Sequence, residues 1–153
     1  PRTLRWGVAA AERARYVELL KHLDLGLEHR MTNKVGLLSG GQRQALTLLM
    51  ATLVPPKLLL LDEHTAALDP KTAAKVLALS DRFISEEKLT ALMVTHNMKD
   101  AIQHGNRLLM MHEGKIIVDV SGDEKKRLTV ETLLSMFGKA SGQQLASDRM
   151  LLS

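Results

Sequence analysis

Apolar residues follow two different patterns along this chain, helical spacing and short continuous runs, and together these patterns predict a mixed α/β architecture. Apolar residues at helical spacing predict amphipathic helices over Ala10–Leu23 and Pro70–Glu87. Short, continuous apolar runs predict strands buried on both faces at Leu58–Leu61 and Thr90–Thr95. Because a strand, a helix long enough to cross a sheet and a second strand follow one another, we expect a right-handed parallel unit.

A further helix is predicted upstream of the first strand. Ser39–Gly41 opens it, the apolar stretch Ala45–Val54 continues it, and Pro55 and Pro56 end it. Beyond its first turn this helix is apolar almost all round, and we therefore expect it to be buried in a core.

The last third of the chain alternates short elements with turns. The pattern predicts a short helix, two strands and a closing helix at Asn97–Gln103, Arg107–Met111, Ile116–Val120 and Thr129–Phe137. Glu113 and Gly114 form a turn dipeptide that favours a hairpin between the two strands. Gly138–Ser153 has no sustained period, so we expect a loosely held tail.

Composition narrows the class of protein. A length of 153 residues with 45% apolar residues can fill the core of one domain. No apolar run reaches the roughly 18–20 residues of a membrane span, so we expect a soluble chain. The absence of cysteine is compatible with a reducing cytosol. The net charge of +4 comes with interspersed acidic residues and few aromatic ones, so we expect no nucleic-acid partner.

Polar side chains follow both strands of the predicted parallel unit. Asp62 and Glu63 come after the first strand and His96 after the second. Because ligands bind at the carboxyl ends of strands in open α/β sheets, we expect these residues to meet in one crevice. Adjacent carboxylates there suit a magnesium nucleotide, one for the cation and one for an attacking water. Taken alone, such a pair more often serves only to solubilise a strand end.

The start of the helix at residue 39 has a separate chemistry. Gly40 and Gly41 allow a ligand to approach the backbone, and a helix N-terminus presents unpaired N–H groups. This arrangement is typical of a phosphate site. An ordinary N-cap by Ser39 beside a flexible glycine pair is the alternative reading.

These residues, taken together, resemble the ATP-binding domain of ABC transporters. Leu38–Gln42 is identical to the ABC signature, and Leu58–Glu63 resembles the Walker B strand. Ala67–Asp69 is similar to the D-loop and His96 to the switch histidine, in the family's order. The resemblance implies an incomplete P-loop NTPase (RecA-like) core with a mostly parallel sheet, flanking helices and part of the helical subdomain. It further implies a helical subdomain part at 1–38, an ATPase core part at 39–140 and a polar tail at 141–153.

The resemblance also implies roles for individual residues. In the family, two ATP molecules lie between two ATPase domains. The residues expected to contact the nucleotide held by the partner domain are Ser39, Gly40, Gly41 and Gln42. Asp62 is expected to support Mg²⁺, Glu63 to polarise the attacking water and His96 to contact the γ-phosphate, while Asp69 lies at the dimer seam.

The sequence departs from the family in three places. It contains no G-x-x-x-x-G-K-[ST] phosphate-binding loop, and we expect the family's Q-loop to be missing as well. We therefore expect a C-terminal fragment of a longer protein that is inactive alone and that aggregates, oligomerises or stays partly disordered because apolar surface is uncovered. His64 stands where the family more often has proline, and we expect it to change only the stiffness of its loop.

Three hypotheses for function follow from the resemblance. The first is the ATP-hydrolysing subunit of a bacterial importer, with a second ABC ATPase domain, a transmembrane permease and an extracellular substrate-binding protein as partners. It would lie in the cytoplasm, peripherally on the inner face of the membrane. The second is a non-transport ABC ATPase of translation or DNA repair. The third is a non-catalytic interaction module.

Overall fold

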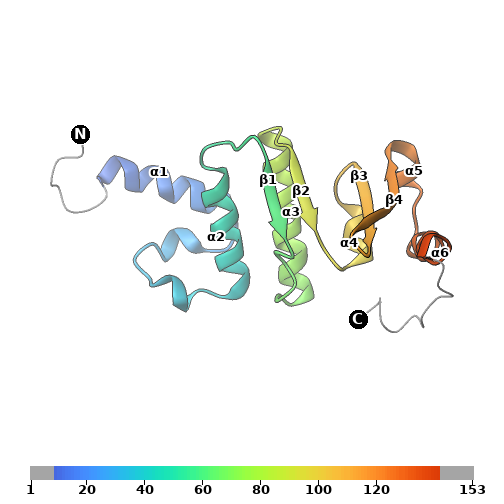
Figure 1. Cartoon of the computed structure of the whole chain (residues 1–153). Helices are drawn as coiled ribbons and strands as arrows, with labels where there is room; N and C mark the ends of the chain where they lie inside the picture. Colours follow the sequence, from blue (N-terminus) through green and yellow to red (C-terminus); the bar gives the residue numbers. More distant parts are fainter. Residues whose placement is uncertain (1–8, 142–153) are drawn as a thin grey trace. The chain divides into compact units, whose positions relative to one another are not determined.

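The structure is a computed structural model that describes residues 9–141, with side chains described up to residue 139. The described residues form two compact units, with the boundary between Leu92 and Met93. Figure 1 shows their helices and strands in chain order. Within residues 9–141, no helix combines the length and apolar content that crossing a bilayer requires.

The first unit begins with helices that precede the sheet. The α-helices α1 (Ala10–Lys21) and α2 (Gly40–Thr52) flank two 3-10 turns, η1 (Leu27–His29) and η2 (Val35–Leu37). The 3-10 turns lie in the segment between the two predicted helices, for which the sequence analysis predicts no element. Both α-helices therefore form where the apolar spacing predicts them, with ends two residues short of the predicted bounds.

Helix α2 buries one face only. Its buried residues are Gly41, Ala45, Leu48, Leu49 and Thr52. The opposite face is exposed to solvent, and Met50 on that face is 64% exposed. The prediction that this helix is buried all round was therefore wrong for the described structure.

The strands β1 (Leu59–Asp62) and β2 (Ala91–Val94) form a two-stranded sheet, and α3 (Pro70–Glu86) connects them. Figure 1 shows both arrows running in the same direction, as expected for a strand–helix–strand unit. Helix α3 begins with an N-cap and a proline in its first turn, two features that start helices. The strand–helix–strand prediction is confirmed.

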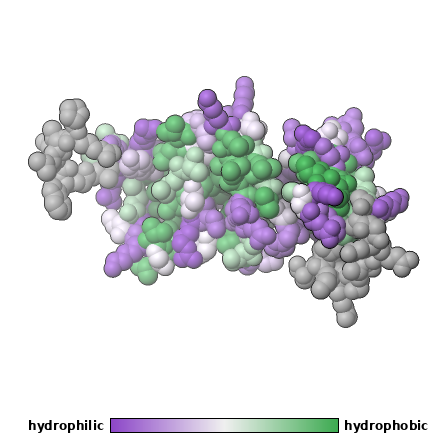
Figure 2. All heavy atoms as spheres, viewed as in Figure 1, coloured by the Kyte–Doolittle hydropathy of each residue, from purple (hydrophilic) through white to green (hydrophobic). Residues whose placement is uncertain are grey.

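The β1–β2 sheet leaves apolar side chains exposed. Leu59 and Leu61 are buried, whereas Leu60 and Leu92 are 64% and 52% exposed. Figure 2 shows the apolar surface over these strands. The expectation of strands buried on both faces was wrong, because one layer of helix can cover only one face of a sheet.

In the described residues, the second unit is a hairpin with three helices. Its elements are α4 (Met98–Gln103), β3 (Arg107–His112), β4 (Lys115–Ser121), α5 (Gly122–Lys126) and α6 (Val130–Ser141). Strands β3 and β4 pair antiparallel, with His112 opposite Lys115. Glu113 and Gly114 between them have φ angles of 48° and 75°, the left-handed conformation that tight hairpin turns need.

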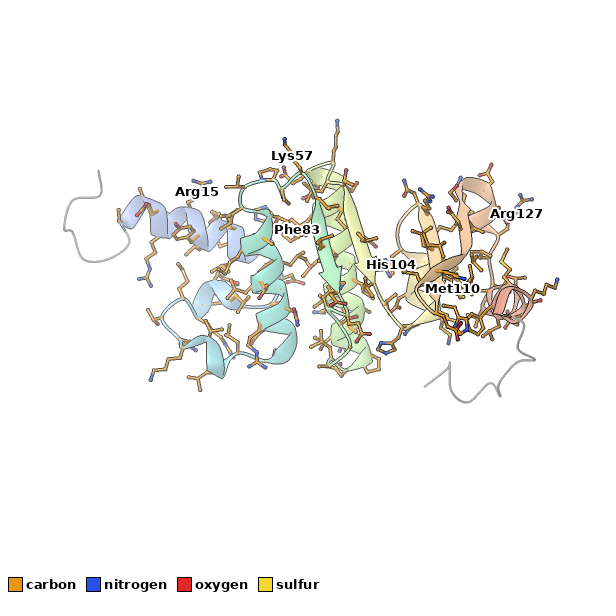
Figure 3. All side chains as sticks on the ribbon, in the orientation of Figure 1. Arg15, Lys57, Phe83, His104, Met110 and Arg127 are labelled. Atoms are coloured by element: carbon orange, nitrogen blue, oxygen red, sulfur yellow. The ribbon has the colours of Figure 1, made fainter. Side chains whose placement is uncertain are left out.

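The core of the second unit lies between the hairpin and its helices. Its buried residues are Leu108, Val118, Val120 and Leu133. Met110 packs against this cluster (Figure 3). In the first unit, by comparison, the exposed side chains of Arg15 and Lys57 extend away from the ribbon. The hairpin thus has an apolar cluster of its own.

Three sequence expectations need correction here. In the described residues the strands form two separate two-stranded sheets, one of them antiparallel, where we expected one mostly parallel sheet. The short helix α5 was not predicted, because its sequence is polar throughout. Helix α6 continues to Ser141, into the segment expected to be a tail. Residues 142–153 of that tail lie outside the described part.

Candidate functional site

The start of α2 is fixed by a reciprocal capping box. The Gln42 backbone N–H donates to Ser39 Oγ at 3.3 Å, and the Ser39 N–H donates to Gln42 Oε1 at 3.1 Å. The N–H groups of Gly40 and Gly41 belong to the first turn, which has no preceding turn of carbonyls. The positive end of the helix dipole adds to them, so this helix start suits an anion.

Two side chains of α2 also hold the segment before the helix. Gln42 Nε2 donates to the Leu25 carbonyl at 3.0 Å, and Arg43 Nη1 donates to the Leu38 carbonyl at 3.0 Å. Gln42 therefore takes part in three hydrogen bonds within the first unit. These bonds fix the direction in which the helix start faces.

Packing requires a glycine at position 41 and leaves little room at Gly40. A Cβ atom on Gly41 would lie 2.0 Å from Thr72 Cγ2, and one on Gly40 would lie 3.0 Å from Leu68 Cδ2. Any side chain at Gly41 would overlap the first turn of α3. The structure thus brings the signature motif against the segment that joins the D-loop to α3.

The two predicted carboxylates lie at the end of β1. Asp62 is the last residue of the strand, and both Asp62 and Glu63 are exposed. Glu63 has a φ of 41°, in the left-handed region that non-glycine residues rarely adopt. The Ala66 N–H donates to the Glu63 carbonyl at 3.0 Å, so a tight turn follows the strand directly.

Asp69 caps α3. Its Oδ1 accepts a hydrogen bond from the Thr72 backbone N–H at 3.1 Å. Hydrogen bonds from Thr72 hold the pKa of the Asp69 carboxyl below its ordinary value. The D-loop aspartate therefore has a structural partner in its own helix.

His96 follows β2 in the second unit and is exposed. Its two neighbours shape the local backbone. The Asn97 N–H donates to Thr95 Oγ1 at 3.1 Å, and Asn97 Oδ1 accepts from the Lys99 and Asp100 N–H groups at the start of α4. The other predicted site residues all lie in the first unit.

The residues present can be compared with what Mg²⁺ requires. No group of three or more His, Cys, Asp or Glu side chains that could hold a metal occurs within residues 9–141. Mg²⁺ at nucleotide sites commonly takes one or two carboxylates, with phosphates and waters as its other ligands. The exposed Asp62 carboxylate fits that mode of binding and does not require a cage of protein ligands.

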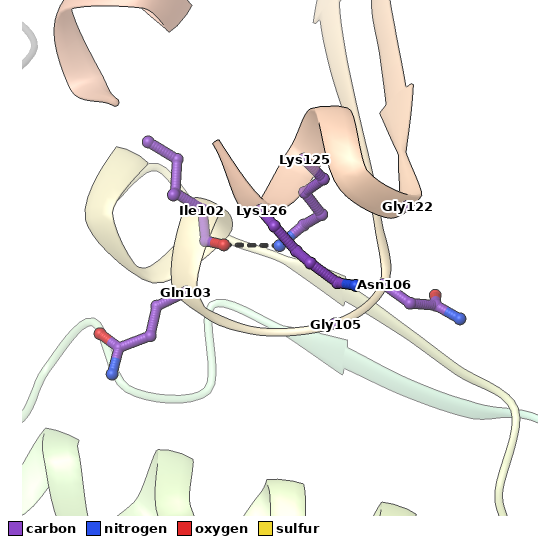
Figure 4. A pocket seen from close by; sticks show the side chains of 7 residues that line it. All are labelled: Ile102, Gln103, Gly105, Asn106, Gly122, Lys125 and Lys126. Atoms are coloured by element: carbon purple, nitrogen blue, oxygen red, sulfur yellow. Dashed lines mark hydrogen bonds between the residues drawn. The ribbon is translucent and has the colours of Figure 1, made fainter. Parts of the chain in front are cut away.

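Sequence reasoning missed a buried lysine in the second unit. Lys125 is only 4% exposed, and its Nζ donates to the carbonyls of Ile102 and His104 at 2.5 and 2.9 Å (Figure 4). Burial lowers its pKa. Lys125 and Ile102 also line a cavity of about 540 Å³ together with Gln103, Gly105, Asn106, Gly122 and Lys126. None of the predicted site residues lines that cavity.

Comparisons with known proteins show the family to which the chain belongs. The family model described as ABC transporter matches residues 4–66, which include the signature and the Walker B strand. The chain is 53% identical over 119 residues to a tyrosine transport ATP-binding protein of Clostridioides difficile, covering 78% of this chain and 47% of that protein. It is 41% identical over 114 residues to the aliphatic sulfonates import ATP-binding protein SsuB of Burkholderia ambifaria, covering 74% and 34%.

Solved structures share the fold. The ADP conformation of MJ1267, an ATP-binding cassette of an ABC transporter, matches with a TM-score of 0.67 at 24% identity, over 87% of this chain and 52% of that one. The ATP-binding cassette MJ0796, in a dimeric post-hydrolysis state bound to ADP and Pi, matches with a TM-score of 0.58 at 32% identity, over 76% and 50%. These matches confirm the predicted fold class.

The chain therefore belongs to the ABC transporter family of ATP-binding proteins. It spans half or less of the length of the curated relatives it matches. The predicted roles of the individual site residues remain predictions.

Proposed function

We propose that this chain forms part of the ATP-hydrolysing subunit of a bacterial ABC importer. The observation that carries the proposal is the joint occurrence of a capped, glycine-opened helix at Ser39–Gln42 and an Asp62–Glu63 pair at the end of β1. The importer assignment is supported by the transport and import names of its relatives. A phosphate-binding loop, absent from these 153 residues, would have to come from another segment or chain.

Each site residue then has a distinct task. The amides of Gly40 and Gly41 bind phosphate oxygens, and Ser39 and Gln42 hold the helix start in position. Glu63 accepts a proton from the attacking water. His96 donates a hydrogen bond to the γ-phosphate. When bound, Mg²⁺ would neutralise phosphate charge, and Asp62 would hold it.

The partners follow from the same proposal. A second ABC ATPase domain supplies the nucleotide that the signature motif contacts, and Asp69 lies at the seam between the two domains. The dimeric MJ0796 cassette supports such an assembly. A transmembrane permease, and a substrate-binding protein outside the cell, complete the importer. The chain then works at the cytoplasmic face of the membrane.

Exchange of Glu63 for glutamine tests the proposal. In the protein as its natural gene encodes it, Glu63→Gln should lower ATP turnover by about 10²- to 10⁴-fold, the usual cost of losing a general base. ATP-bound dimers should accumulate. Glu113→Gln is a matched control, because Glu113 is also an exposed glutamate with positive φ. Undiminished hydrolysis by Glu63→Gln would remove Glu63 from this role.

A further inference from the structure

The loop after β1 holds Glu63 in an uncommon backbone conformation. A φ of 41° at a residue other than glycine is strained and persists only where surrounding contacts impose it. The direction of the Glu63 carboxylate depends on this backbone. A contact that holds residue 64 in place therefore also restricts the direction in which the Glu63 carboxylate points.

His64 makes such a contact. Its Nε2 lies 3.0 Å from Ser80 Oγ, across sixteen residues of sequence. Ser80 Oγ donates its own hydrogen to the Val76 carbonyl at 3.0 Å. A hydroxyl has only one hydrogen, and we assign that of Ser80 to the Val76 carbonyl. With this assignment Ser80 accepts from His64, which places the ring proton on Nε2.

The anchor for His64 is well placed to resist movement. Ser80 is 2% exposed and lies in the buried face of α3 beside Val76 and Leu77. Helix α3 begins at its capped N-terminus and runs for 17 residues, so Ser80 lies in its interior. The loop that carries Glu63 is thereby tied to a rigid element of the same unit.

We infer that His64 is a positioning residue for ATP hydrolysis: its hydrogen bond to Ser80 holds the loop in the conformation that aims Glu63 at the attacking water. The inference rests on the role proposed above for Glu63. It extends the expectation that His64 changes loop stiffness, because it names the bond that would hold the loop. A misplaced catalytic group can cost about 10²-fold in rate even when binding is intact.

The test uses the protein as its natural gene encodes it. His64→Phe keeps a ring but removes the donor, Ser80→Ala removes the acceptor, and His64→Gln keeps an N–H donor. His64→Phe and Ser80→Ala should each lower kcat by about 10- to 100-fold, with the KM for ATP changed by less than about twofold. His64→Gln should retain most of the activity. Ser85→Ala, an exposed serine on the same helix, is the matched control and should change neither constant.

A second comparison distinguishes an effect of His64 that acts through Glu63 from a general destabilisation of the loop. In the Glu63→Gln background, His64→Phe should cause no further loss, because the residue through which His64 acts is already disabled. Thermal melting of each variant shows whether it folds. If His64→Phe does not fold, the same measurements are made on Ser80→Ala instead.

The outcomes distinguish this inference from the proposed function. A kcat that stays at the wild-type value in His64→Phe and Ser80→Ala would overturn the inference while leaving the proposed function standing. An additional loss in the Glu63→Gln background would overturn it as well. A wild-type protein that does not hydrolyse ATP would overturn the proposed function, and this inference with it.

Discussion

The contact between Gly41 and Thr72 allows a quantitative prediction. In Gly41→Ala the new Cβ would lie 2.0 Å from Thr72 Cγ2, and because real Cβ contacts stay above 3.0 Å, one atom must move by at least about 1 Å. Overpacking of this kind costs about 1–3 kcal/mol. The exchange of glycine for alanine in a helix returns about 0.5–1 kcal/mol.

The difference between the two terms is a net loss of about 0–2.5 kcal/mol, and we expect the upper part of this range. Thr72 is β-branched and therefore stiff at χ1, and its backbone N–H is bound to the Asp69 cap. We expect a net loss of about 1–2.5 kcal/mol in the free energy of unfolding. For a domain of this size, that corresponds to a fall in Tm of about 2–10 °C.

The assay is urea and thermal unfolding of the protein as its natural gene encodes it. Thr72→Ser removes Cγ2 and leaves the nearest Thr72 atom, Cβ, at 3.6 Å, an ordinary contact. The double variant, Gly41→Ala with Thr72→Ser, should therefore regain most of the stability that Gly41→Ala loses. Gly36→Ala is the control, because a Cβ there meets nothing within 4 Å. A Gly41→Ala protein as stable as wild type, or a double variant without recovery, would refute the reasoning.

Three further predictions follow. Since folding lowers the pKa of Asp69, the stability that its carboxylate adds is present above the ordinary carboxyl pKa and is lost as the pH falls through the folded pKa. Urea titrations should therefore show that the stability advantage of wild type over Asp69→Asn shrinks in acid. A stability difference that does not change with pH would contradict this prediction. Lys125→Met should lower the free energy of unfolding by about 1–3 kcal/mol, because two hydrogen bonds of the buried lysine are lost, whereas the exposed control Lys126→Met should lower it by under about 0.5 kcal/mol. Equal urea-unfolding energies for the two variants would show that the lysine bonds do not stabilise the fold. The 153 residues alone should show no ATPase activity in a phosphate-release assay, which measurable turnover would contradict.

Local sequence signals predicted the helices and strands well, because their physical causes are local. Asp69 followed by Pro70 is a start signal that works within one turn, and it placed α3 correctly. The turn at Glu113 and Gly114 fixed the hairpin in the same way. The residues of the candidate site were also identifiable, because the signature and Walker B motifs are contiguous in sequence.

Features that depend on distant residues could not be predicted. Leu60 has the apolar character of a buried strand residue, yet no periodicity says whether a second layer covers it. Helix α5 has no apolar period, and nothing in its sequence distinguishes the buried Lys125 from its exposed neighbours. The bond from His64 to Ser80 and the fit of Gly41 against Thr72 join segments far apart in sequence.

The central claim is that the amides at the start of α2 bind a triphosphate held by another ATPase domain. The most direct measurement is an experimental structure of the Glu63→Gln protein assembled as a dimer with ATP. The account predicts the Gly41 amide nitrogen within about 3 Å of a γ-phosphate oxygen, the distance of a direct hydrogen bond. A dimer with ATP bound and the start of α2 facing away from it would contradict the account.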